Sequence, residues 1–157
     1  MSRLAKLDYF GTILFGGIHA ASSLYWGLGG DALVETVGQG AVEWKQDSPL
    51  LVPIVLIPLG LAKATAVAVP ILNSQGRLPW PRLVRAASWL GAAGLVLYGG
   101  AYATLSWLSL SGRLGEVEDR VGLLGHAYLW DPLFVAWGLS LVLALANDPF
   151  SERHEHT

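Results

Sequence analysis

Long apolar segments alternate with short polar segments along the whole chain. The clearest apolar segment, residues 50–72, contains a single charged residue, Lys63, near its middle. A segment of this length and apolarity predicts a transmembrane helix. Similar segments predict further spans at about 9–28, 86–110 and 121–146. We therefore expect an all-α fold, a four-transmembrane-helix bundle forming a single integral membrane domain over residues 1–157, with a disordered tail at 147–157.

The connection at 29–48 also has an apolar pattern. Within it, residues 32–44 predict a short interfacial helix, because apolar side chains recur there at helical spacing. These side chains are Val34, Val37, Ala41 and Trp44. Two glycines inside the segment weaken this helix.

The distribution of lysine and arginine predicts the orientation of the bundle. With four alternating spans, one side of the membrane has six of these residues and the other has three. The six are Arg3, Lys6, Arg77, Arg82, Arg85 and Arg153, and the three are Lys45, Arg113 and Arg120. Because basic residues favour the cytoplasmic side, we expect both termini to be cytoplasmic.

Composition supports a lipid environment and narrows the chemistry. The chain is 53% hydrophobic and 14% charged, whereas soluble domains contain roughly 25% charged residues. The absence of cysteine excludes disulfides, thiol redox chemistry and cysteine-ligated metals. A net charge of −2 gives no indication of nucleic-acid binding. No metal site and no nucleotide-binding or hydrolase motif is predicted, so enzymatic activity stays uncertain and is less expected than binding.

Three ionisable residues lie deep within the predicted spans. From the helical rise, His19, Lys63 and Asp131 lie about 13, 19 and 15 Å below the outer ends of their spans. Ionisable groups at such depth are costly and by default indicate a functional site or a partner. We therefore expect these residues to cluster in the outer half of the membrane.

Helical spacing predicts which residues face the interior of the bundle. In the first span they are Thr12, Gly16, His19, Ser23 and Trp26. In the second they are Gly60, Ala64 and Ala68, beside Lys63. In the third they are Gly91, Tyr98 and Tyr102, and in the fourth Tyr128, Asp131 and Gly138. His126 lies about 140° around an α-helix from Asp131, so we assign it to the cluster less directly.

A structural interpretation and a functional one are both open. In the structural one, Lys63 and Asp131 form an ion pair, Asp131 caps the half-helix that begins at Pro132, and His19 donates to a carbonyl group. In the functional one, Lys63 holds an acidic or carbonyl group of a small amphiphile such as a lipid or quinone. His19 and Asp131 then hold or relay a proton. The walls are formed by Trp26, Tyr98, Tyr102 and Trp130.

Two further alternatives belong to different classes of protein. The chain could be a structural or accessory subunit, as a homo-oligomer or within a larger membrane complex. It could also be a b-type haem protein ligated by His19 and His126, although their estimated depths differ by roughly 7 Å. Apart from haem, no cofactor is indicated.

Several of these residues together resemble a known family. They are His19, the run from Tyr25 to Gly30, the lone lysine of the second span, and Trp130-Asp131-Pro132. This pattern resembles the small bacterial four-helix membrane proteins of domain-of-unknown-function family 3995, over about residues 7–146. Tyrosine is expected in place of Trp130. The resemblance implies a multi-pass protein of the bacterial inner membrane, with the histidine, lysine and aspartate in one site. The family has no established activity to carry over to this chain.

Overall fold

The computed structural model describes residues 3–148, and every regular element in that part of the chain is helical. The long helices are α1 (Arg3–Gly27), α3 (Leu51–Ser74), α4 (Pro81–Leu110) and α6 (Asp131–Asn147). The short elements are the 3-10 helix η1 (Val34–Val37), α2 (Gln39–Asp47), α5 (Arg120–Gly125) and the π-helical turn η2 (His126–Trp130). The disordered tail was predicted to begin at 147, but Asn147 still belongs to α6. The rest of the predicted tail, residues 149–157, lies outside the part of the chain that the structure describes.

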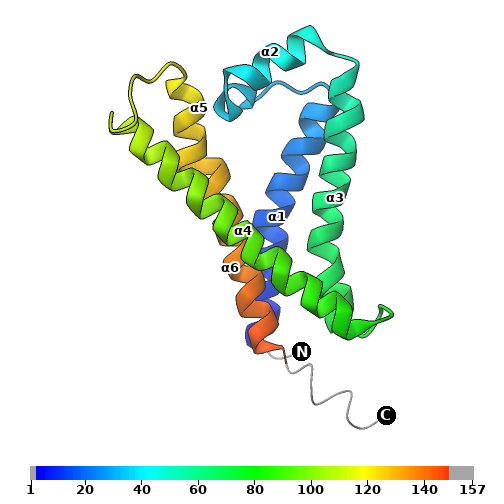
Figure 1. The fold of residues 1–157 in the computed structure, drawn as a ribbon. Coiled ribbons are helices and arrows are strands. Elements are labelled where there is room, and N and C mark those ends of the chain that lie inside the picture. Colours follow the sequence, from blue (N-terminus) through cyan, green and yellow to red (C-terminus); the bar gives the residue numbers. More distant parts are fainter. Residues whose placement is uncertain (1–2, 149–157) are drawn as a thin grey trace.

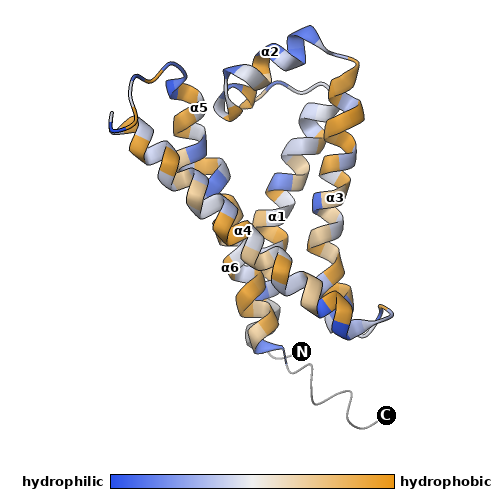
Figure 2. Cartoon of the chain, in the orientation of Figure 1, coloured by the Kyte–Doolittle hydropathy of each residue, from blue (hydrophilic) through white to orange (hydrophobic). Residues whose placement is uncertain are grey.

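Three helical segments are long and apolar enough to cross a membrane. They are Leu51–Ser74, Pro81–Leu110 and the continuous segment Arg120–Asn147 formed by α5, η2 and α6. The helix α1 has 25 residues but is not among them, because its buried side carries polar groups such as Thr12, His19 and Ser23. The prediction of four spans is thus confirmed for three helices, whereas α1 is less apolar than the span predicted there. Figure 2 shows the more hydrophilic character of α2 and of the connection between α4 and α5.

The helix α1 lies at the centre of the fold and packs against both α3 and α6, while α4 packs across α6 and contacts α3 much less (Figure 1). The first turns of α1 and the end of α6 lie at the same end of the molecule, where Asn147 Nδ2 donates to Asp8 Oδ2 over 2.8 Å. The α3–α4 connection lies at this terminal end, whereas η1 and α2 lie at the opposite end.

The predicted polar stripe of α1 is confirmed as its interior face. All five of its residues are buried: Thr12, Gly16, His19, Ser23 and Trp26. On α3 the prediction holds only for Gly60, since Ala64 and Ala68 are exposed. The buried residues of α3 follow another stripe, which passes beside Lys63: Val52, Gly60, Val67, Pro70, Asn73 and Ser74.

Small residues, rather than tyrosines, form the buried face of α4. A Cβ atom on Gly99 would lie only 2.6 Å from the backbone oxygen of Asp131, and one on Gly138 would lie 2.8 Å from that of Ala92. The backbones of α4 and α6 therefore approach too closely for large side chains between them. Tyr98 and Tyr102 lie on the outer face instead, each 48% exposed. The prediction that these tyrosines face inward is wrong, as it is for the exposed Gly91.

The start of α4 also differs from the prediction. The helix begins at Pro81 rather than at about residue 86, because the first turn of a helix does not need the N–H that proline lacks. Trp80 precedes it in a left-handed conformation with φ of 53°. The sequence Pro-Trp-Pro is therefore a helix start as well as a turn.

Candidate functional site

The π-helical turn η2 brings His126 and Asp131 together. In an α-helix these positions would lie about 140° apart, but a π turn pairs residues five apart along the chain. His126 Nδ1 lies 3.1 Å from Asp131 Oδ2. The predicted angular separation of the two residues is therefore wrong. The same turn leaves Tyr128 67% exposed, contrary to its predicted place beside Asp131.

The His126–Asp131 pair contains one shared proton. His126 Nε2 lies 3.0 Å from the carbonyl oxygen of Val37, and a carbonyl can only accept, so Nε2 carries a proton. A second proton must then lie between Nδ1 and the carboxylate. Whichever atom holds it, the pair as a whole is neutral. This neutrality makes the burial of Asp131, which is 1% exposed, tolerable without another charge.

Asp131 therefore has neither of the roles that the structural interpretation predicted for it. Its ion-pair partner in the described chain is His126, not Lys63. Its backbone is helical and its side chain does not cap α6, because the helical segment continues through η2. A π turn inside an α-helix is rare and marks a local irregularity in it, here next to Pro132.

Lys63 has no carboxylate partner among the described residues. Its ammonium donates to Ser23 Oγ over 2.9 Å, and it lies 5.6 Å from the centre of the Phe134 ring. An ammonium has three donors, and within residues 3–148 this is its one hydrogen bond. The cation–π contact with Phe134 compensates only part of the missing solvation.

His19 lies next to this lysine on the interior face of α1. Its Nε2 donates to the carbonyl oxygen of Trp130 over 3.0 Å, as the structural interpretation expects. Its ring stacks on Phe134 with ring centres 3.7 Å apart. Phe134 thus connects His19 and Lys63, a role that was not predicted from the sequence. Its position one helical turn after Asp131 was the available signal.

A cavity of about 230 Å³ lies beside Lys63 and is covered by η1 and α2. We call residues 34–47, which comprise these two helices, the lid segment. Its inner surface is formed by the four predicted apolar residues, Val34, Val37, Ala41 and Trp44. The opposite wall comes from α1 and α3, with Ser23, Trp26, Val52, Leu56, Leu59 and Lys63. Apart from two lysines and a serine, the lining is apolar.

Three of the predicted site residues hold the lid segment and the loop before it. Trp26 Nε1 donates to the carbonyl oxygen of Ala32 over 2.8 Å. Trp130 Nε1 donates to Thr36 Oγ1 over 3.0 Å, and His126 bonds the carbonyl of Val37 as described above. The two indoles also meet edge to face, with ring centres 5.1 Å apart. These aromatic residues therefore position the lid. Trp26 also lines the cavity, as expected, whereas Trp130 and His126 do not.

Two further features of α5 support the lid segment. Asp119 accepts from the backbone N–H groups of Gln39, at the start of α2, and of Gly122, at the start of α5, over 2.6 and 2.8 Å. A Cβ atom on Gly125 would lie 1.9 Å from the carbonyl oxygen of Thr36. Only glycine at this position lets the lid backbone rest directly on α5. Neither residue was predicted, although glycine inside a helix was the signal for the second.

The remaining predicted residues lie away from the cavity or do not fit their expected role. Tyr98 and Tyr102 pack on one another with ring centres 4.6 Å apart, and neither lines the lidded cavity. The two histidines do not fit the haem alternative, because Nε2 of both His19 and His126 already donates to a carbonyl group. Neither of these nitrogens is therefore free to ligate a haem iron.

Comparison with known proteins agrees with the resemblance noted from the sequence. No curated protein and no solved structure matches this chain. A family match covers residues 16–141, which include His19, Lys63 and Asp131. The chain belongs to the family described as Protein of unknown function (DUF3995).

Proposed function

We propose that this protein is an integral membrane protein that binds a small amphiphile with an acidic head group in the lidded cavity. The supporting observation is Lys63, a cation in the middle of an apolar helix with no carboxylate partner among the described residues. A charge in that environment is unfavourable unless something compensates it. A ligand carboxylate or phosphate at the cavity end of Lys63 would accept from the two unused donors.

The shape and lining of the cavity support a small, largely apolar ligand. Its volume of about 230 Å³ is below the roughly 300–1,000 Å³ of pockets that hold drug-sized molecules. Its walls offer the side chains of valine, leucine and alanine to an alkyl chain. A lipid-like acid with a short chain, or the acidic end of a longer one, would match both features.

The orientation of the site depends on α1. We infer that α1 also crosses the membrane, because a helix of 25 residues is about 37 Å long and exceeds the roughly 30 Å core. Its outer face is apolar, with Phe10, Ile13, Leu14 and Ile18 exposed. Both termini are then cytoplasmic and the lidded cavity lies in the outer leaflet.

Single cysteines test this orientation cleanly, since the chain has none of its own. Gln46→Cys in the lid segment should react with a membrane-impermeant maleimide in intact cells. Gln75→Cys at the terminal end, and Ser2→Cys, should react only after lysis. The reverse pattern would contradict the orientation, and a split between Ser2→Cys and Gln75→Cys would show that α1 does not cross.

Ligand binding is tested with three alkyl probes of equal length: octanoate, octanol and octylamine. Binding to purified protein in phosphatidylcholine nanodiscs is measured by calorimetry. Octanoate should bind at least tenfold more tightly than the other two, and Lys63→Met should remove that preference. The matched control is Leu61→Met, a lipid-facing change on the same helix, which should leave it intact. Equal binding of octanoate and octanol, or unchanged selectivity in Lys63→Met, would refute the proposal.

An accessory-subunit role is a second candidate, supported by one feature of α4. Small residues are exposed along it at helical spacing, including Ala87, Gly91, Gly94 and Ala101, and such faces favour close helix association in membranes. Native mass spectrometry of protein released gently from its own membrane tests this role. A second chain in the particle, lost in Gly94→Leu, would support it, and a monomer in both would oppose it.

A further inference from the structure

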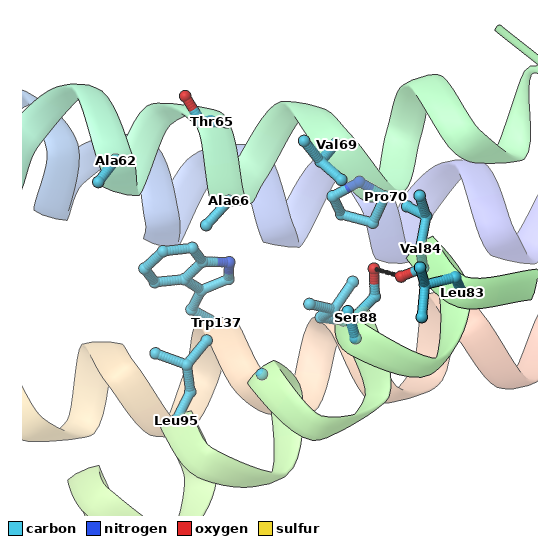
Figure 3. Close-up of a pocket in the computed structure, with 13 residues that line it drawn as sticks. Ala62, Thr65, Ala66, Val69, Pro70, Leu83, Val84, Ser88, Leu95 and Trp137 are labelled. Atoms are coloured by element: carbon cyan, nitrogen blue, oxygen red, sulfur yellow. Dashed lines mark hydrogen bonds between the residues drawn. The ribbon is translucent and has the colours of Figure 1, made fainter. Parts of the chain in front are cut away.

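A second, larger cavity lies between α3, α4 and α6, away from the lid segment. It has a volume of about 640 Å³, within the range of pockets that enclose a whole small molecule. Its lining is almost entirely apolar, with residues such as Ala66, Val69, Pro70, Leu95 and Leu141 (Figure 3). The divergence of α3 and α4 creates the space, since these helices make few contacts with one another.

One polar group in this cavity has no partner. The indole of Trp137 is 2% exposed, and its buried Nε1 makes no hydrogen bond within residues 3–148. Figure 3 shows the ring beside Ala66, with its nitrogen on the side nearest Ser88. An indole N–H can only donate, so what the site lacks is a hydrogen-bond acceptor. Buried donors are rarely left unsatisfied in proteins, which indicates that a bound molecule supplies this acceptor.

The other polar groups nearby are already bonded within their own helices. The Ser88 hydroxyl donates to the carbonyl of Val84 over 2.8 Å. The Thr65 hydroxyl donates to the carbonyl of Leu61 over 2.8 Å, and in Figure 3 it points away from the cavity. A water molecule needs two to four polar partners, which this apolar site does not offer. An apolar molecule with a single well-placed acceptor fits better.

We propose that this cavity binds a membrane-dissolved quinone, with one ring carbonyl accepting from Trp137 Nε1. Depth favours a quinone over a glycerolipid. Trp137 lies about 15 Å from the end of α6 at Asn147, near the middle of a hydrocarbon core of roughly 30 Å. Glycerolipid ester carbonyls belong to the interface and do not reach that depth, whereas a quinone ring dissolved in the core does. This site is independent of the lidded cavity and of Lys63.

Indole NMR tests the proposal directly. Protein labelled with ¹⁵N-tryptophan in phosphatidylcholine nanodiscs is titrated with ubiquinone-2, with squalene and with dioleoylglycerol. Ubiquinone-2 should move the Trp137 indole proton downfield, as expected for a new hydrogen bond, and the other two should not. The signal is assigned by its loss in Trp137→Phe. No movement with ubiquinone-2, or an equal movement with squalene or dioleoylglycerol, would overturn the proposal.

Two variants in which an alanine of α3 is replaced by phenylalanine keep the test decisive if Trp137→Phe fails to fold. Ala66→Phe places a ring inside the cavity and should abolish the movement, whereas Ala68→Phe, on the exposed part of the same helix and outside the cavity, should preserve it. In folded Trp137→Phe, affinity for ubiquinone-2 should fall about threefold to tenfold, the equivalent of one hydrogen bond. Lys63→Met should leave the movement unchanged, which separates this site from the lidded one. If the Trp137 signal still moved in Ala66→Phe, the proposal of a quinone in this cavity would be refuted.

Discussion

The two cavities differ in how their polar groups are held. Around the lidded cavity, donors from α1 and η2 bond the lid segment and the loop before it, and the buried carboxylate has its own histidine. In the apolar cavity, the indole of Trp137 is the exception in a lining of alkyl side chains. Among the described residues, each cavity has a donor group in an apolar setting that its neighbours leave incompletely used, Lys63 in one and Trp137 in the other. In a membrane, a donor group whose hydrogen bonds are incompletely satisfied therefore indicates a ligand more clearly than the number of polar residues does.

The largest expected effect distinguishes the partner of Asp131. Asp131→Ala should destabilise the fold by about 2–4 kcal/mol, because it leaves His126 Nδ1 without its hydrogen-bond partner and empties a fully buried position. Thermal unfolding in detergent, or unfolding by SDS, measures this. Double-mutant cycles sharpen it: coupling of Asp131 to His126 should be about 1–3 kcal/mol, and coupling to Lys63 below about 0.5 kcal/mol. A larger coupling of Asp131 to Lys63 than to His126 would support an ion pair between Lys63 and Asp131 instead.

The next effect concerns the contact between the lid segment and α5. Gly125→Ala should cost about 1–3 kcal/mol, because its methyl group would occupy the position of the Thr36 carbonyl. Hydrogen exchange of the lid amides should accelerate. Gly17→Ala is the control, since nothing lies within 4 Å of a Cβ there, and it should be neutral or stabilise α1 by up to about 1 kcal/mol. Slow exchange in Gly125→Ala would show that the lid does not rest on α5.

A change of opposite sign is expected at Lys63. Without added ligand, Lys63→Met should raise stability by about 1–2 kcal/mol, because it replaces an incompletely compensated charge in an apolar helix. The thermal midpoint in nanodiscs measures the gain, and Leu61→Met should stay within about 0.5 kcal/mol. A loss of stability in Lys63→Met would mean that Ser23 and Phe134 already compensate the ammonium fully.

The smallest effect concerns one hydrogen bond of the lid segment. Thr36→Val should cost about 1–2 kcal/mol, because it leaves the N–H of Trp130 without an acceptor and also removes the bond from the Thr36 hydroxyl to the carbonyl of Leu33. Trp130 fluorescence and exchange of the amides around Val37 should report the change locally. Thr104→Val, whose hydroxyl bonds only its own helix, should have no such effect. If the two variants changed fluorescence and amide exchange equally, the hydrogen bond from Trp130 would not hold the lid segment.

Much of the fold follows from hydrophobic pattern alone. The positions of α3, α4 and the segment 120–147 were predicted closely, because long apolar segments leave little choice in a membrane. The polar stripe of α1 was also identified, and that stripe is why α1 falls below the apolarity of a typical span. The face of α4 was assigned wrongly because tyrosines were preferred to small residues, although close helix packing in membranes selects small ones.

The candidate site was less predictable, for a geometric reason. Helical spacing of 100° per residue places His126 and Asp131 far apart, and it fails wherever a helix contains a π turn. That turn left no pattern in the sequence beyond the proline at 132. Likewise, Phe134 connects His19 and Lys63 only because α1, α3 and α6 meet in space, which no local spacing reports. The apolar face of the lid segment was found because its four residues recur every three or four positions. The single helix predicted over 32–44 is, however, divided into η1 and α2 at Gly38, which has a φ of 127°.

The π turn at 126–130 also has a consequence for how one helical segment presents its two halves. One extra residue in a helix advances everything beyond it by about 100°. The segment 120–147 can therefore direct the small residues of α6 toward α4 while directing the glycines of α5 toward the lid. Deleting one residue from the turn would restore a regular α-helix and rotate the glycines away from the lid without changing any side chain that contacts it. The angular phase of this helix, as much as its side chains, thus determines whether the cavity beside Lys63 is covered.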